Sequence, residues 1–256
     1  MVDDSFNYLL TLEYDGGGFH GWQSQKGLKA VQATLEKALF DNLRQEICIF
    51  GAGRTDTGVH AEGQAASFFL KNSICLDRLV RGTNFYLKNV PLRVLSAQAV
   101  PSSFHARFSA IQRFYRYRIL NRAVMSPLKD GRVWWIAKRL DLRALCEAAA
   151  QFVGHHNFGA FRGRFCQSAT PFKTMDVCEA EEIGDEVHIF VKSRSFLHHQ
   201  VRLMVGTLAQ VGLGRLAPSD VVRLLQEGQR GTAGPKAPAQ GLCLTEVVYP
   251  AAAFKL

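Results

Sequence analysis

The sequence predicts an α+β fold made of two halves, and three observations support this. Short stretches alternate apolar with polar residues, which is typical of strands, and longer ones repeat apolar residues at helical spacing. These stretches follow a β-α-β-β-α-β order in the first half and a similar order in the second. A chain of 256 residues, 47% of them hydrophobic, can bury a core in each half. We expect domains at residues 1–105 and 106–256, with a functional cleft between them.

The first half begins with a strand at 7–14, followed by the glycine-rich turn "DGGGFHGW". Apolar residues at 31, 35, 38, 39 and 43 then predict a helix over 31–43. Its remaining elements are expected as strands near 46–51 and 64–70, a helix near 76–87 and a strand near 93–100.

The second half has its own set of elements and no sequence repeat of the first. They are expected as a strand at 112–120, a helix at 141–152, strands at 174–183 and 186–194, helices at 198–212 and 219–227, and a closing strand at 242–248. The expectation that the second half repeats the fold of the first therefore depends on element order alone.

Charge and composition narrow the function classes. The net charge is +9, and 20 arginines outnumber 11 lysines. An arginine-rich surface suits phosphate, although a basic but merely solvated surface is the alternative. The acidic N-terminus lacks the positive charge of a targeting peptide, and no apolar run approaches the ~18 residues of a membrane span. We expect a cytoplasmic protein that does not enter the membrane. Six scattered cysteines without a CxxC pair indicate reduced thiols.

The stretch "FHARFSAIQRFYRYRILNR", residues 104–122, contains five arginines, five aromatic residues and no acid. Rings can stack on bases while guanidinium groups hold the phosphates, so Arg107, Arg113 and Arg116 are candidate RNA contacts. With a period of two, Tyr115 and Tyr117 share one strand face with Arg113. The alternative is a half-buried strand whose arginines point to water.

The stretch "GAGRTDTGVHAEGQ", residues 51–64, contains an ionisable pair, Arg54 and Asp56, among four glycines. It matches neither G-x-G-x-x-G nor a Walker A loop. Metal binding is not expected, because there is no HExxH motif and adjacent histidines on a helix or strand cannot aim at one ion. An aspartate beside an arginine stays ionised, which suits a nucleophile or a charge stabiliser. A plain turn, with Asp56 capping amides, is the alternative.

Five blocks in order, "EYDGGGFHGWQ", "GAGRTDTGVHAEGQ", "FHARFSAIQRFYRYRI", "SFLHHQVRLMVGTL" and "GLCLTEVVYP", closely resemble the TruA family of tRNA pseudouridine synthases. The resemblance spans nearly the whole chain. It implies a pseudouridine synthase fold, with two ferredoxin/RRM-like β-α-β-β-α-β halves, mainly antiparallel sheets and a central catalytic cleft. It also implies isomerisation of uridine in the anticodon stem-loop of tRNA, at positions 38 to 40, by a homodimer that uses no cofactor and no metal.

The resemblance also implies roles for individual residues. Asp56 takes the place of the catalytic aspartate, and its glycine-rich loop would admit a flipped base. Tyr115 matches the tyrosine that stacks on the target base and removes the C5 proton, and Arg202 matches the arginine that pairs with the carboxylate. The implied substrate contacts are Arg54, His60, Gln64 and Leu244, together with the arginines of the 104–122 stretch.

Three positions depart from the family pattern: Asn157 stands where aspartate is usual, Thr57 where alanine is common, and residues 25–27 form a short connection. Two other functions fit the same sequence: an RNA-binding module without catalysis, and a pseudouridine synthase with another RNA target. The sequence leaves open which tRNA position is modified. It also leaves open whether Asp56 attacks C1′, attacks C6 or removes the C2′ proton.

Overall fold

The chain divides into two compact units in a computed structural model that describes residues 5–255. Unit 1 comprises Met1–Gln112 and Leu244–Leu256, and unit 2 comprises Arg113–Cys243. The strands are mostly antiparallel and helices pack against them, so the predicted mixed class of helices and strands is confirmed. The ferredoxin/RRM-like character of the halves stays a prediction.

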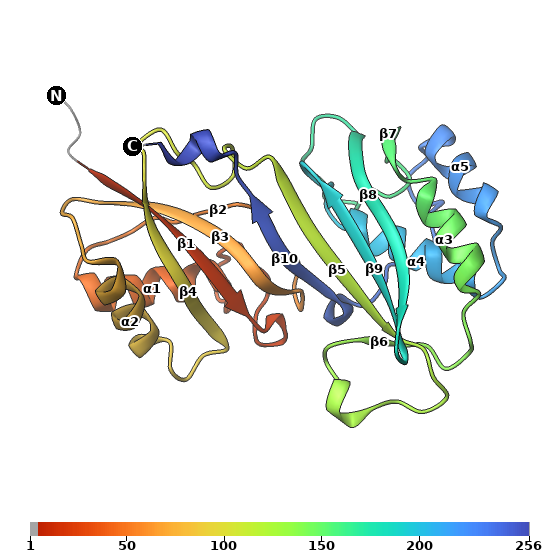
Figure 1. The fold of residues 1–256 in the computed structure, drawn as a ribbon, viewed down its shortest axis with the longest axis horizontal. Helices are drawn as coiled ribbons and strands as arrows, with labels where there is room; N and C mark the ends of the chain where they lie inside the picture. Colours follow the sequence, from red (N-terminus) through yellow and green to blue (C-terminus); the bar gives the residue numbers. More distant parts are fainter. Residues whose placement is uncertain (1–4, 256) are drawn as a thin grey trace. The chain divides into compact units, whose positions relative to one another are not determined.

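Unit 1 has the element order that the sequence predicts, β-α-β-β-α-β. Its elements are β1 (Phe6–Tyr14), α1 (Val31–Leu43), β2 (Phe50–Gly51), β3 (His60–Leu70), α2 (Leu76–Tyr86) and β4 (Leu92–Val100). The strands run in the order β4-β1-β3, with β2 also paired to β3, and all these pairs are antiparallel. Figure 1 shows α1 and α2 side by side, and the two helices contact each other.

Unit 2 contains the strands β5 (Gln112–Leu120), β6 (Trp134–Trp135), β7 (Gly154–Asn157), β8 (Phe172–Ile183) and β9 (Glu186–Ser193). They are arranged in the order β5-β9-β8-β7, and β6 pairs parallel to β5. Three helices, α3 (Leu142–Ala150), α4 (Gln200–Gly212) and α5 (Pro218–Glu227), pack beside this sheet, with α3 against both other helices and β8 (Figure 1). Strand β10 (Leu242–Val248) crosses from unit 2 into unit 1.

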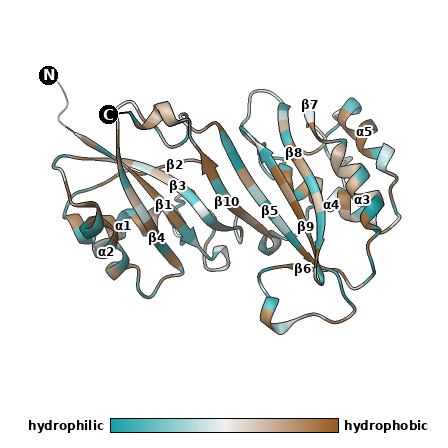
Figure 2. Cartoon of the chain, in the orientation of Figure 1, coloured by the Kyte–Doolittle hydropathy of each residue, from teal (hydrophilic) through white to brown (hydrophobic). Residues whose placement is uncertain are grey.

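Short 3-10 turns complete the structure: η1 (Gly16–Gly18), η2 (Pro127–Lys129), η3 (Ala239–Gly241) and η4 (Ala251–Phe254). Figure 2 shows hydrophilic and hydrophobic residues mixed along α2 and α5, which is the pattern of helices with one face in a core. Among residues 5–255, no helix has both the length and the apolar character needed to cross a membrane.

The C-terminal segment packs in unit 1. Val247, Tyr249 and Phe254 contact a buried cluster that includes Phe104 and Ala106. The structural division therefore differs from the expected domains at residues 1–105 and 106–256 in two ways. The first boundary follows Gln112, and the segment from Leu244 onward returns to the first unit. Element order along a chain does not reveal such a return, because it depends on long-range packing.

Several predicted elements have wrong bounds. The strand expected near 64–70 already starts at His60, and two other differences have a clear local cause. The strand expected at 46–51 is only Phe50–Gly51, because the Ile49 amide donates to the Glu36 carboxylate, at 3.1 Å, instead of joining the sheet. The helix expected at 198–212 starts at Gln200, because His199 has a left-handed backbone, with φ of 65°. Strands β6 and β7 were not predicted, and both are too short to give a clear alternation.

Candidate active site

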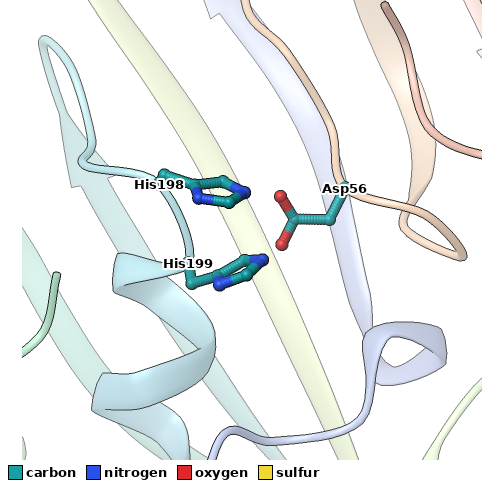
Figure 3. A group of neighbouring side chains, drawn as sticks. All are labelled: Asp56, His198 and His199. Atoms are coloured by element: carbon teal, nitrogen blue, oxygen red, sulfur yellow. The ribbon is translucent and has the colours of Figure 1, made fainter. Parts of the chain in front are cut away.

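Asp56 lies on the loop that joins β2 to β3 in unit 1 (Figure 3). The Val59 amide donates to the Asp56 carbonyl at 3.1 Å, and Gly58 between them has a φ of 79°. This closes a tight turn directly after the aspartate. The Asp56 side chain is half-buried, whereas Arg54 is exposed.

The glycine-rich segment after β1 holds this loop in place. The Trp22 amide donates to the Thr55 carbonyl at 3.0 Å, and the Tyr14 hydroxyl lies 2.9 Å from the Thr55 hydroxyl. Gly21 has a φ of 87°, and a Cβ on it would lie 2.8 Å from the Thr55 carbonyl oxygen. Only glycine combines this backbone conformation with so close an approach. Thr55, which precedes Asp56, is therefore held by contacts with Trp22, Tyr14 and Gly21.

Two glycines of the 51–64 stretch admit other parts of the protein. A Cβ on Gly51 would lie 2.4 Å from the Trp22 ring, and one on Gly63 would lie 2.3 Å from the Thr245 carbonyl oxygen in β10. Their small size is thus explained by packing within unit 1. The interpretation that the glycines of this loop admit an RNA base is not needed for these two.

His60 and Gln64 are both buried, with 5% and 0% of their surface exposed. The Gln64 amide group donates to the Gly53 carbonyl at 2.9 Å. The Gly16 amide donates to His60 Nδ1 at 3.1 Å, and Asp15 Oδ1 lies at the same distance from that nitrogen. The Gly16 bond requires an Nδ1 without a proton, and Asp15 Oδ1 also accepts from the Gly17 amide at 2.9 Å. His60 therefore links the Asp56 loop to the segment after β1, whereas the Gln64 bond braces the Asp56 loop itself.

In unit 2, β5 confirms the predicted alternation. Arg113, Tyr115, Tyr117 and Ile119 are buried, whereas Phe114, Arg116 and Arg118 are only partly buried. The Tyr115 ring lies edge-on to Phe196, with 5.2 Å between ring centroids.

The neighbouring Tyr117 has a different environment from Tyr115. It is fully buried, and its hydroxyl donates to the Pro238 carbonyl at 2.8 Å. Burial raises the pKa of Tyr117, against a smaller opposing effect of the Arg202 charge. Tyr117 is therefore a structural residue of unit 2, with no freedom to accept a substrate proton at neutral pH.

Arg202 is on the first turn of α4, whose residues Val201, Met204, Val205 and Leu208 are buried as the helical spacing predicts. The Arg202 Nε donates to the Ala237 carbonyl at 2.8 Å, and the Ala237 amide donates to the Arg202 carbonyl at 3.0 Å. This pair of bonds fixes the guanidinium stem against the segment before η3. Its position thus comes from unit 2 itself.

The other predicted residues are divided between surface and interior. Arg107 is exposed in unit 1 and Arg116 is partly buried in unit 2. Arg113 is buried and donates to the Arg194 carbonyl at 2.5 Å, and Leu244 is fully buried. Asn157 accepts from the Gly159 amide at 3.0 Å, a bond that an aspartate at this position could also make. The departure at 157 therefore preserves this local turn.

One pair of adjacent histidines, His198 and His199, contradicts the prediction that such side chains cannot aim together. His198 and His199 precede α4 (Figure 3), and their ring centroids are 3.7 Å apart. The left-handed backbone of His199 turns its side chain to the same side as that of His198. His155 and His156 follow the expectation, since His155 stacks on Phe172 and His156 bonds the Val153 carbonyl.

Sequence reasoning also missed a buried ionic cluster at one end of β5. Glu186, on β9, accepts two hydrogen bonds from Arg118, at 2.7 and 2.8 Å, and lies 2.8 Å from both Lys129 and His188. Burial alone would raise the pKa of Glu186, but these hydrogen bonds outweigh it and lower the pKa to about 2. The cluster joins β5, β9 and the 121–139 segment. No motif signals it, because its members are far apart in the sequence.

The chain is similar to known proteins over nearly its whole length. A family model for tRNA pseudouridine synthases matches residues 148–250. Proteins named tRNA pseudouridine synthase A are similar over nearly the full length. The one from Paramagnetospirillum magneticum is 45% identical over 97% of both chains. The one from Rhodospirillum centenum is 47% identical over 94% of this chain and 99% of its own, and one from Wolbachia pipientis is 41% identical with the same coverage. The chain therefore belongs to the TruA family of tRNA pseudouridine synthases, which are isomerases.

Proposed function

We propose that this protein converts uridine to pseudouridine in the anticodon stem-loop of tRNA, at positions 38 to 40, with Asp56 as the catalytic carboxylate. The observation that supports this most strongly is the near-full-length similarity to proteins named tRNA pseudouridine synthase A. Asp56 lies on a loop whose backbone is fixed by Trp22, Gly21 and Tyr14, as a precisely oriented reactive group requires.

The reaction needs few chemical groups. The C1′–N1 glycosidic bond breaks, the uracil turns, and a C1′–C5 bond forms, after which C5 loses its proton and N1 gains one. No electrons are transferred, so the proposal includes neither a cofactor nor a metal. A carboxylate can act on the sugar or the base, and a stacked aromatic ring can hold the uracil while it turns.

Unit 2 supplies the remaining proposed groups. Tyr115, on the regular strand β5, is the proposed stacking residue and proton acceptor. Arg202 is proposed to supply a positive charge to the reaction. Arg54, Arg107 and Arg116 are proposed phosphate contacts, in keeping with a net charge of +9. Because His60, Gln64, Arg113 and Leu244 are buried, we propose that they position the groups that contact RNA.

We also propose a cytoplasmic homodimer. Light scattering at micromolar concentration should give twice the 28.5 kDa mass of the chain. A monomer mass would contradict this part of the proposal.

The test of the proposed function uses tRNA transcripts labelled with [5-³H]uridine, in which isomerisation at C5 releases tritium. One transcript carries uridine at positions 38, 39 and 40, and a matched transcript carries cytidine there, with base pairs restored. We expect release from the first transcript only. Equal release from both would place the target elsewhere in the RNA, and binding without any release would favour the RNA-binding module.

A further inference from the structure

Unit 1 has a row of three rings in contact at its surface, formed by Phe50, His105 and Phe108, with angles of 41° and 42° between neighbouring ring planes. Ring centroids are 4.9 Å apart between Phe50 and His105, and 4.5 Å apart between His105 and Phe108. The Arg107 guanidinium lies over the Phe108 ring, 5.5 Å from its centroid. Phe108 is 71% exposed and Phe50 is 39% exposed. We call these three rings, with Arg107, the aromatic row.

The backbone beneath the aromatic row is firmly held. Phe104 and Ala106 point inward and belong to a buried cluster. The Ala106 amide donates to the Ser67 hydroxyl at 3.0 Å, and the Tyr249 hydroxyl donates to the Ala106 carbonyl at 2.7 Å. Residues 105, 107 and 108 are thus presented outward from a fixed segment, and need little ordering when they bind a partner.

The central ring of the row is fixed as well. The Arg107 amide donates to His105 Nδ1 at 3.1 Å, so this nitrogen carries no proton. Burial lowers the pKa of His105 and outweighs an opposing backbone hydrogen bond, and the Arg107 charge adds a smaller lowering effect. A neutral ring at physiological pH is a flat aromatic surface between two phenylalanines.

Such a group has no evident role in folding. Single exposed apolar residues are ordinary, but three aromatic rings in contact, one of them with an arginine over it, are not scattered surface residues. Unpaired nucleotides are held by this combination, because bases stack on the rings and arginine attracts the phosphate.

We infer that the aromatic row binds unpaired nucleotides of the RNA substrate by stacking, at a place separate from the Asp56 loop. The inference rests on the proposed function for the identity of the RNA. Phe50 lies on β2, which leads directly into the Asp56 loop, so the row and Asp56 belong to the same unit. A nucleotide held on the row would therefore fix the RNA relative to the catalytic carboxylate.

The test measures the affinity of the protein for a fluorescent oligouridylate and for an unmodified tRNA transcript. The variants are Phe108→Ala, Phe108→Leu and Phe108→Tyr. The matched control is Phe85→Ala, because Phe85 is 62% exposed in the same unit and also has a cation, Lys88, 5.2 Å from its ring centroid. We expect Phe108→Ala and Phe108→Leu to weaken binding about 5- to 150-fold, the range for one lost base stack. Phe108→Tyr and Phe85→Ala should bind as the wild type does.

Three results would overturn the inference: unchanged affinity of Phe108→Ala, an equal loss in Phe85→Ala, or full affinity of Phe108→Leu, which would indicate apolar contact without stacking. Tritium release by the wild type is scored separately. Its absence would refute the proposed function, while the binding comparison would still decide the role of the row.

Discussion

The loop around Asp56 and strand β5 position their proposed catalytic groups in different ways. Asp56 is held by contacts between distant segments, because Trp22, Tyr14 and Gly21 all fix its neighbour Thr55. Tyr115 is held by the regular alternation of a strand, whose inward face it shares with Tyr117. The difference teaches that a strand can place a side chain through its own sequence pattern, whereas an irregular loop needs its surroundings to do so.

Apart from the loss of Asp56 itself, the largest expected effect separates the two tyrosines of β5. Tyr115→Phe should lower the rate about 10²- to 10⁴-fold with little change in stability, because it removes the proposed proton acceptor. Tyr117→Phe should retain activity but cost about 1 kcal/mol of the free energy of unfolding, because the Pro238 carbonyl loses its donor. Single-turnover tritium release and urea denaturation measure the two quantities. If Tyr117→Phe lost activity and Tyr115→Phe kept it, the proposed role of Tyr115 would be contradicted.

The second prediction concerns the ionic cluster that holds β5 to β9. Glu186→Gln should destabilise unit 2 by about 3 kcal/mol at neutral pH, because it removes the negative charge that pairs with Arg118 and Lys129 in this buried position. The Glu186 pKa is lowered from 4.5 to about 2, so its contribution is complete above pH 4.5 and is lost as the pH falls toward 2.

Denaturation curves between pH 7 and pH 2 test this dependence. The stability difference between the wild type and Glu186→Gln should shrink as the pH falls. A difference that stays constant across this range would show that the carboxylate charge does not stabilise the strand pair.

The smallest expected effect tests the close contact behind the Asp56 loop. Gly21→Ala introduces a Cβ 2.8 Å from the Thr55 carbonyl, whereas Gly27→Ala has a similar φ, 78° against 87°, and no atom within 4 Å. Both variants place an alanine in a left-handed backbone, which lowers the free energy of unfolding in each. The difference between the two variants therefore measures the contact with the Thr55 carbonyl. We expect Gly21→Ala to cost about 1–3 kcal/mol more, the usual range for overpacking, and to lower activity. Equal costs would mean that Gly21 does not fix the loop.

The same contrast explains how much of the structure the sequence could predict. The helix at 31–43 and the strands at 112–120 and 242–248 have the predicted bounds, because their apolar spacing is local and regular. The strand at 46–51 was overestimated because a carboxylate of α1 takes the Ile49 amide. The His198–His199 pair was missed because no sequence pattern signals a left-handed histidine.

For the candidate site, the motifs identified the residues, but they did not reveal the contacts that fix those residues in position. The glycines of "DGGGFHGW" were visible as a turn, yet their packing against Thr55 and Val59 depends on a contact between segments far apart in the chain. The burial of His60 and Gln64 has the same origin. Trp22 and Gly51 offered a further signal for the contact between these segments. They are a large and a small residue in two separate motifs, and they pack together.

The central claim is that the Asp56 carboxylate performs the chemistry, and one comparison tests it most directly. Tritium release from an unmodified [5-³H]uridine tRNA transcript is measured for the wild type, for Asp56→Asn and for Asp130→Asn. Asp130 is the matched control, because it follows η2 in unit 2 and its carboxylate accepts a hydrogen bond from the Gly131 amide at 2.9 Å. We predict release by the wild type and Asp130→Asn and none by Asp56→Asn, with equal tRNA affinity in all three. Release by Asp56→Asn at the rate of the wild type would contradict the account.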